Sequence, residues 1–194
     1  MTAVSSAPAP PAVRRLAPYE NWRPPIVGVG LLVPVGADRL VLVRTCGILS
    51  IPTGAVEDAQ DVRDAARAVL TGLPHGLPIQ RRVAVQHVQT RRRQVITHTV
   101  VTRPLLPEEV PCLVYRDLRA EVCILPTTAA AVALTERGRT RLLLGLQALA
   151  IGATVFVHDD RIQLELASEE GTSPQTHTRE NGITMAPSVH TAAT

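Results

Sequence analysis

The residues best suited to chemistry are carboxylates that follow a glycine loop. Glu57 lies three residues after Gly54, and Asp61 and Asp64 follow shortly afterwards. Carboxylate oxygens are the ligands that Mg²⁺ prefers in proteins. Asp61 and Asp64, however, stand at the start of a predicted helix, where acidic side chains cap exposed backbone N–H groups. We therefore expect Asp61 to be a helix cap, and only Glu57 and Asp61 remain as metal ligands if a metal binds at all.

The segment from Ile51 to Leu73 resembles a Nudix box that lacks most of its glutamates. That box runs Pro-Gly-Gly, a first Glu and a second Glu, and then a helix with Ala-Ala-x-Arg-Glu-apolar-x-Glu-Glu-x-Gly-apolar. The positions that match are Gly54, Glu57, Ala65, Ala66 and Thr71-Gly72-Leu73. Gln60 stands at the second Glu, Ala68-Val69 replaces Arg-Glu, and the later Glu pair is missing.

The resemblance implies a metal-dependent hydrolase of nucleoside diphosphates linked to another group, but the missing glutamates argue against that activity. Alanine and valine cannot ligate Mg²⁺. We expect a degenerate Nudix-like domain without hydrolase activity that serves as a nucleotide-binding, protein-interaction or regulatory module. It would need no cofactor. The alternatives are an active Mg²⁺-dependent Nudix hydrolase and a nucleic-acid-binding regulator.

If the chain is an active enzyme, its catalytic residues would be Glu57 and Glu109. Glu109 resembles, by position only, a late-loop glutamate that some Nudix enzymes use as general base. The other interpretation is that Glu108 and Glu109 are a solvated charge pair in a loop.

A phosphate could still bind without a metal. The Gly54 loop and the following helix start offer backbone N–H groups, and Arg44, Arg81 and Arg82 are candidate guanidinium donors. The sequence therefore favours a nucleotide or nucleotide-sugar ligand of modest affinity.

Two histidines are further candidates for ligand contact. His87 and His98 fall on opposing strands of a predicted hairpin, where they could face each other, a ligand or the protein itself. The hairpin tip carries Arg91-Arg92-Arg93 without an interleaved aromatic residue. Solvated charge explains this tip better than nucleic-acid binding.

These residues need a scaffold of strands and helices, which the apolar pattern supplies. Together with the resemblance, it predicts an α/β fold: a Nudix-like α/β/α sandwich with a mixed sheet over 26–151, plus a C-terminal β-hairpin. The expected strands are 26–35, 39–45, 81–88, 95–103, 111–114, 121–125, 154–157 and 162–166. The expected helices are 61–71 and a region from Thr127 to Leu149 that is interrupted at Gly138.

Composition sets the boundaries of the domain. Residues 1–25 read as a flexible Pro/Ala-rich arm, 26–166 as the domain, and 167–194 as a disordered tail. No segment resembles a signal peptide or a membrane span, and the net charge is only +3. The twenty basic residues are all Arg, which is typical of GC-rich bacterial genomes.

The cysteines and the last helix give two further expectations. Cys46, Cys112 and Cys123 lie in apolar runs without ligand spacing, so we expect buried free thiols and a cytoplasmic protein. The apolar stretch 139–151 favours core packing, with a homodimer contact as the alternative.

Overall fold

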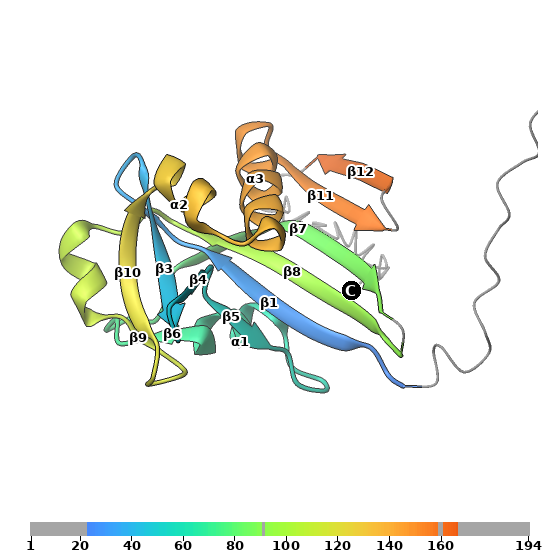
Figure 1. Ribbon diagram of the computed structural model, residues 1–194, viewed down its shortest axis with the longest axis horizontal. Coiled ribbons are helices and arrows are strands. Elements are labelled where there is room, and N and C mark those ends of the chain that lie inside the picture. The colour runs from blue at the N-terminus through green and yellow to red at the C-terminus, as the bar shows by residue number, and fades with distance from the viewer. Residues whose placement is uncertain (1–22, 91, 159–160, 167–194) are drawn as a thin grey trace, which may run out of the picture.

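The computed structural model describes residues 23–90, 92–158 and 161–166. Its largest sheet has six strands in the order β12-β11-β7-β8-β1-β5 (Figure 1). The β1–β8 and β7–β11 pairs are parallel and the other neighbours are antiparallel, so the sheet is mixed as predicted. The strands are β1 Ile26–Leu32, β5 Thr53–Ala55, β7 Ile79–Gln89, β8 Gln94–Thr102, β11 Ala153–His158 and β12 Arg161–Leu166.

A second sheet of four strands lies beside the first, and a two-stranded sheet completes the β structure. The four strands are β2 Pro34–Val35, β3 Arg39–Thr45, β4 Ile48–Ser50 and β10 Glu121–Pro126, and the pair is β6 Leu70–Thr71 with β9 Val114–Tyr115. The predicted strand 26–35 is divided, because the chain leaves the large sheet after Leu32 and joins the second sheet at Pro34. The apolar run is continuous because residues from Val29 to Val33 are all buried.

Helix α1 Val62–Val69 lies on one face of the large sheet and α3 Glu136–Ala150 lies on the other (Figure 1). Helix α2 Thr127–Ala133 lies beside α3 and packs against β3 and β10 of the second sheet. The predicted α/β/α sandwich is therefore confirmed. Each face has its own core. Val29, Leu31, Ala66, Val69 and Val100 belong to the cluster with α1, and Leu32, Val101, Leu142, Ala148 and Val155 belong to the cluster with α3.

Helix α1 begins as the sequence predicts. The Asp61 carboxylate accepts hydrogen bonds from the backbone N–H groups of Arg63 at 2.7 Å and Asp64 at 3.3 Å. The helix ends at Val69 rather than at residue 71, because Leu70–Thr71 pairs with Val114–Tyr115. Residue 72 lies against the backbone of Cys112 and must be glycine, because its φ is +100° and an added Cβ would overlap the Cys112 carbonyl oxygen.

The C-terminal helical region differs from the prediction at its start and at its break. Thr127 does not cap a helix with its side chain; its hydroxyl donates to the Asp38 carbonyl at 2.8 Å. The break lies at Leu134 and Thr135, and Gly138 is inside α3. Thr135 causes this difference, because its side chain caps α3 by accepting from the Gly138 N–H at 3.3 Å.

The predicted strand 111–114 is also wrong for most of its length. A 3₁₀ helix covers Pro107–Cys112, and only Val114–Tyr115 forms a strand. Prolines at 107 and 111 explain the difference, because proline cannot donate a ladder hydrogen bond.

The cysteines are free, as expected, but the prediction that they are buried is wrong. Cys46 and Cys112 are exposed and Cys123 is half-buried. Cys46 lies in a turn with φ of +49°, and Cys112 ends the 3₁₀ helix, so local conformation overrides their apolar neighbours.

The predicted flexible arm up to residue 22, the predicted disordered tail from residue 167 and Arg91 at the hairpin tip lie outside the described residues. None of the described helices is long and apolar enough to cross a membrane.

Candidate functional site

Gly54 lies on β5, a short edge strand held against β1. It pairs with Val29, and the flanking hydrogen bonds run from the Leu31 N–H to Pro52 and from the Val56 N–H to Val27, each at 2.9 Å. The loop that resembles the start of the Nudix box is therefore fixed to the large sheet.

Val69, at the end of α1, packs directly against Gly54. A Cβ added to Gly54 would lie 2.7 Å from Val69 Cγ2, so this contact requires glycine. Val69 is only 1% exposed and belongs to the core. The position that matches a helix glutamate of the Nudix pattern thus holds a buried apolar side chain.

A pocket of about 510 Å³ opens beside Gly54. Its lining combines β5 with the chain that follows β9: Thr53, Gly54, Ala55, Tyr115, Arg116, Asp117 and Leu118. The Tyr115 hydroxyl donates to the Thr53 carbonyl at 2.9 Å, and the Arg116 N–H donates to the Val69 carbonyl at 3.2 Å. These two bonds fix both walls of the pocket relative to the end of α1.

Arg116 supplies the positive charge of this pocket. Its Nη1 would lie 3.3 Å from a Cβ added to Gly54, so the guanidinium is beside the glycine backbone. Its guanidinium has no hydrogen bond or ion pair with any other residue that the structure describes. The neighbouring Asp117 carboxylate is held by Arg119 at 3.0 Å, and that side-chain bond is the main cause of its lowered pKa. The Arg116 guanidinium is therefore available to an anion.

The carboxylates near the helix start do not form a metal site. Glu57 is exposed, and its backbone N–H is bound by the Gln60 side chain at 3.0 Å. Asp61 caps α1, and Asp64 pairs with Arg67 at 2.7 Å. Within the described ranges no three His, Cys, Asp or Glu side chains group to hold a metal ion. The residues present do not fit Mg²⁺, which takes about six oxygen ligands.

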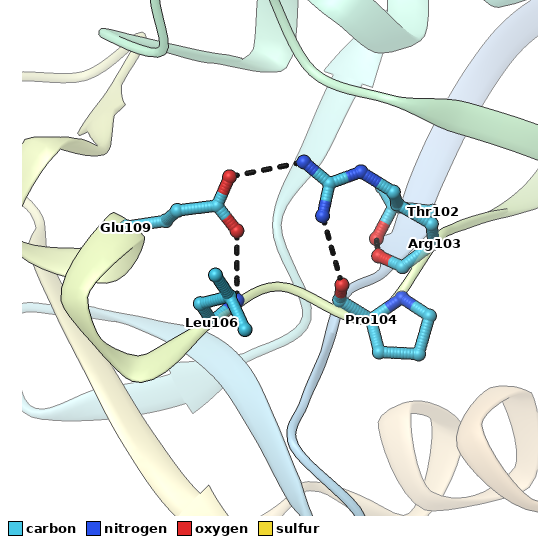
Figure 2. A network of polar contacts seen from close by, with 5 residues as sticks. All are labelled: Thr102, Arg103, Pro104, Leu106 and Glu109. Carbon is cyan, nitrogen blue, oxygen red and sulfur yellow. Dashed lines mark hydrogen bonds and ion pairs between the residues drawn. The ribbon is translucent and has the colours of Figure 1, made fainter.

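Glu109 is engaged in a network of its own, which Figure 2 shows. Its carboxylate accepts from the Leu106 N–H at 2.7 Å and from Arg103 Nη2 at 3.0 Å. The Leu106 bond and then the Arg103 bond lower the pKa of Glu109. A lowered pKa makes a weaker base, and Glu109 does not line the Gly54 pocket.

The three arginines selected from the sequence lie elsewhere. Arg44 pairs with Glu121 across β3 and β10 at 2.9 Å. Arg81 donates to the carbonyl oxygens of Ala148 and Ala153, at 3.0 and 2.8 Å, and thus ties α3 and β11 to β7. Arg82 lies over the Phe156 ring, 5.9 Å from its centre. None of these arginines lines the Gly54 pocket.

The two histidines selected from the sequence do come together. His98 pairs with Val85 and His87 pairs with Ile96, so the two rings share one face of the sheet as diagonal neighbours. His87 also packs edge-on against His158, with ring centres 5.2 Å apart. Val29 pairs with both His98 and Gly54, so His98 lies in the same row as Gly54, about 10 Å away across two strand spacings.

The surroundings of His98 favour its neutral form. Its Nδ1 is buried without a hydrogen-bond partner in the described part of the chain. Burial is the main cause of its lowered pKa, and the charges of Arg82 and His87 add to it. A neutral imidazole accepts a hydrogen bond at one ring nitrogen and donates one from the other, but the buried Nδ1 is closed to a ligand in this conformation.

Sequence reasoning missed Tyr115 and Arg116 as site residues. Both follow Gly54 by more than sixty positions, in a segment without a recognisable motif. Only the pairing of β6 with β9 carries them to the end of α1.

The fold is similar to solved structures of the MutT and Nudix type. The E. coli ORF135 protein aligns with 14% identity and a TM-score of 0.51 over 65% of this chain and 91% of that protein. The MutT protein of Methanosarcina mazei Go1 aligns with 12% identity and a TM-score of 0.52 over 65% of this chain and 96% of that protein. A MutT Nudix hydrolase of Burkholderia pseudomallei aligns with 15% identity and a TM-score of 0.46 over 62% of this chain and 97% of that protein. No protein-family model and no curated protein sequence matches the chain. The two alignments with TM-scores above 0.5 confirm the predicted Nudix-like fold.

Proposed function

We propose that this Nudix-like domain binds the phosphate of a nucleotide or nucleotide sugar in the pocket between Gly54 and Arg116, without hydrolysing it. Such a domain would act as a nucleotide-binding or regulatory module. The observation that carries the proposal is the Arg116 guanidinium, which lies beside Gly54 with no carboxylate bound to it.

Binding is supported by the chemistry of the pocket walls. A guanidinium offers paired N–H donors that suit phosphate oxygens. Glycine lets a ligand approach the backbone closely, and the volume of about 510 Å³ is within the usual range for small-molecule sites. His98 does not line this pocket, because the buried Val29 lies between it and Gly54 in the row, so we propose a contact with His98 only for a ligand that extends beyond the pocket. Because Arg116 is exposed, we expect a dissociation constant in the roughly micromolar-to-millimolar range.

The proposed lack of hydrolysis rests on the residues around α1. Metal-assisted attack on a pyrophosphate needs carboxylates that hold the metal and activate water. The structure puts buried Val69 at one such position, and Asp61 and Asp64 are engaged as a cap and an ion pair.

Titration calorimetry with ADP-ribose, ADP and ATP, with and without Mg²⁺, tests the binding. Arg116→Ala should weaken it at least about tenfold, because it removes the only charge-assisted donor that we assign to the phosphate. Arg44→Ala is the matched control, since it also removes one exposed arginine but lies on the other sheet. Equal losses in both variants would contradict the assignment and indicate nonspecific charge attraction.

Product analysis under the same conditions tests the absence of turnover. We expect no release of nucleoside monophosphate with Mg²⁺ or Mn²⁺. Robust metal-dependent hydrolysis that Glu57→Gln or Glu109→Gln abolishes would instead favour an active enzyme.

A further inference from the structure

In the part of the chain that the structure describes, strand β12 is an edge of the six-stranded sheet with no further strand paired to it. It is the terminal strand on the β11 side, and all six of its residues are exposed. The opposite edge, β5, has only three residues. Natural proteins protect long edges with proline, bulges or short strands, because unpaired backbone groups attract another strand. The segment from Arg161 to Leu166 has no proline or glycine.

One face of β12 carries a row of exposed apolar side chains. Ile162, Leu164 and Leu166 are 61%, 60% and 76% exposed. Leu164 pairs with Val155, which is buried in the core that includes α3 residues, so the row lies on the α3 side of the sheet. Exposed apolar side chains at alternate positions of an edge strand are typical of an interaction surface.

The other face of β12 carries Arg161, Gln163 and Glu165. Neither charged side chain has an ion-pair partner among the described residues. The opposite charges lie four positions apart on one strand, with Gln163 midway between them. When a second copy of this strand lies antiparallel to the first, the positive end of each strand therefore faces the negative end of the other.

We propose that two copies of the chain pair through antiparallel β12 strands around a two-fold axis, so that one sheet continues through both copies. Gln163 lies on the axis opposite Gln163 of the second copy. Arg161 then lies opposite Glu165 of the second copy, and this ion pair occurs twice. Ile162 lies opposite Leu164 of the second copy on the α3 face.

The side-chain pattern selects this register. A shift of one residue would place Ile162 opposite Glu165 and would mix the apolar and polar faces. A shift of two residues would keep the faces but remove the Arg161–Glu165 pairs. A two-fold interface is the common closed arrangement for identical chains, and the reversed charges of β12 suit a second copy.

Charge exchange in the full-length chain tests the pairing. By sedimentation equilibrium at tens of micromolar, the native chain should have about twice its 20.8 kDa mass. Glu165→Arg places arginines opposite each other, and Arg161→Glu does the same with glutamates. Each variant should self-associate at least about tenfold more weakly. An equimolar mixture of the two variants restores both pairs of opposite charge, so the mixture should form a heterodimer. The double variant that carries both substitutions also restores these pairs and should form a homodimer.

Leu143→Lys is the control at a different surface, because Leu143 is 50% exposed on α3 within the stretch 139–151. It should leave the dimer intact. Circular dichroism and thermal unfolding would show that every variant is folded. The proposal fails if the native chain is monomeric at several hundred micromolar, if the mixture does not associate, or if Leu143→Lys separates the copies while Glu165→Arg does not.

Discussion

Two side chains of opposite polarity lie beside Gly54. Val69 comes from the end of α1, and Arg116 comes from the segment after β9. The valine is buried in the core, and the arginine is exposed to solvent. Together they leave a site that, among the described residues, has one free guanidinium and one carboxylate, Asp117, which Arg119 already binds, and this is too few oxygen ligands for Mg²⁺. Our proposal that an anion binds here without being hydrolysed rests on this combination.

Restoring a glutamate at position 69 should destabilise the fold. Val69→Glu puts a carboxyl group into a core position that is 1% exposed, so we expect a loss of several kcal/mol in the free energy of unfolding. Urea unfolding measures this loss. Ala68→Glu, at the exposed neighbouring position, is the control and should change stability by less than about 0.5 kcal/mol. A Val69→Glu variant as stable as the native chain would show that the position has room and solvent for a ligand.

His98 makes the stability of the fold depend on pH. Burial holds the folded pKa of His98 below the ordinary histidine value of about 6.5, so between these two values the unfolded chain binds the extra proton. The free energy of unfolding should therefore fall as the pH is lowered from 7 to 5. His98→Gln should make this fall smaller, which thermal unfolding across that range would show. His75→Gln, in an exposed turn, controls for the substitution. An unchanged pH profile in His98→Gln would contradict the role of this ring.

At the scale of elements, α1 is short because both of its ends are fixed by side-chain and strand contacts. Asp61 caps its first turn, and β6 begins immediately after Val69. The eight-residue helix makes about two turns, so its position depends on the cap and on packing more than on its own helix propensity.

Loss of the cap should have a measurable cost. Asp61→Ala removes the acceptor of the Arg63 and Asp64 N–H groups, so we expect a loss of about 1 kcal/mol in the free energy of unfolding. Asp64→Ala breaks only an exposed ion pair with Arg67 and should have a smaller effect. Urea unfolding of both variants gives the comparison. Equal losses would mean that the carboxylate charge, rather than the cap, stabilises this helix start.

At the scale of the whole molecule, α3 lies close to the large sheet because Gly145 has no side chain. A Cβ at this position would overlap Leu32 of β1 and lie 3.6 Å from Thr99 of β8. Arg141 from the same helix donates to the Gln86 side chain of β7 at 3.1 Å. The helix is thus fitted to the middle of the sheet by one close contact and one polar contact.

A larger side chain at position 145 should destabilise the domain. Gly145→Leu forces a large side chain against Leu32, which is 1% exposed, and we expect a loss of about 1–3 kcal/mol despite the better helix propensity of leucine. Gln147→Leu adds the same side chain at an exposed position of α3 and should leave stability nearly unchanged. If Gly145→Leu raises the melting temperature, the helix can move away from the sheet at little cost.

Local sequence patterns predicted much of this architecture. Apolar runs predicted β1, β3, β7 and β8, and Asp61 predicted the start of α1, because strand periodicity and capping act over a few residues. The errors came where neighbouring groups compete. Thr135 rather than Thr127 provides a side-chain cap, and proline at 107 and 111 replaces a predicted strand with a 3₁₀ helix.

The sequence by itself determined the order of the elements and the loss of the helix glutamates, since both follow from residue types along the chain. Only the tertiary structure decided which arginine reaches Gly54. Arg44, Arg81 and Arg82 were closer in sequence or more conspicuous, yet each is directed to another partner. Arg116 reaches the glycine because strand pairing joins residues 70–71 to 114–115, a contact between distant segments. Such contacts depend on packing of the whole chain, and no local pattern specifies them.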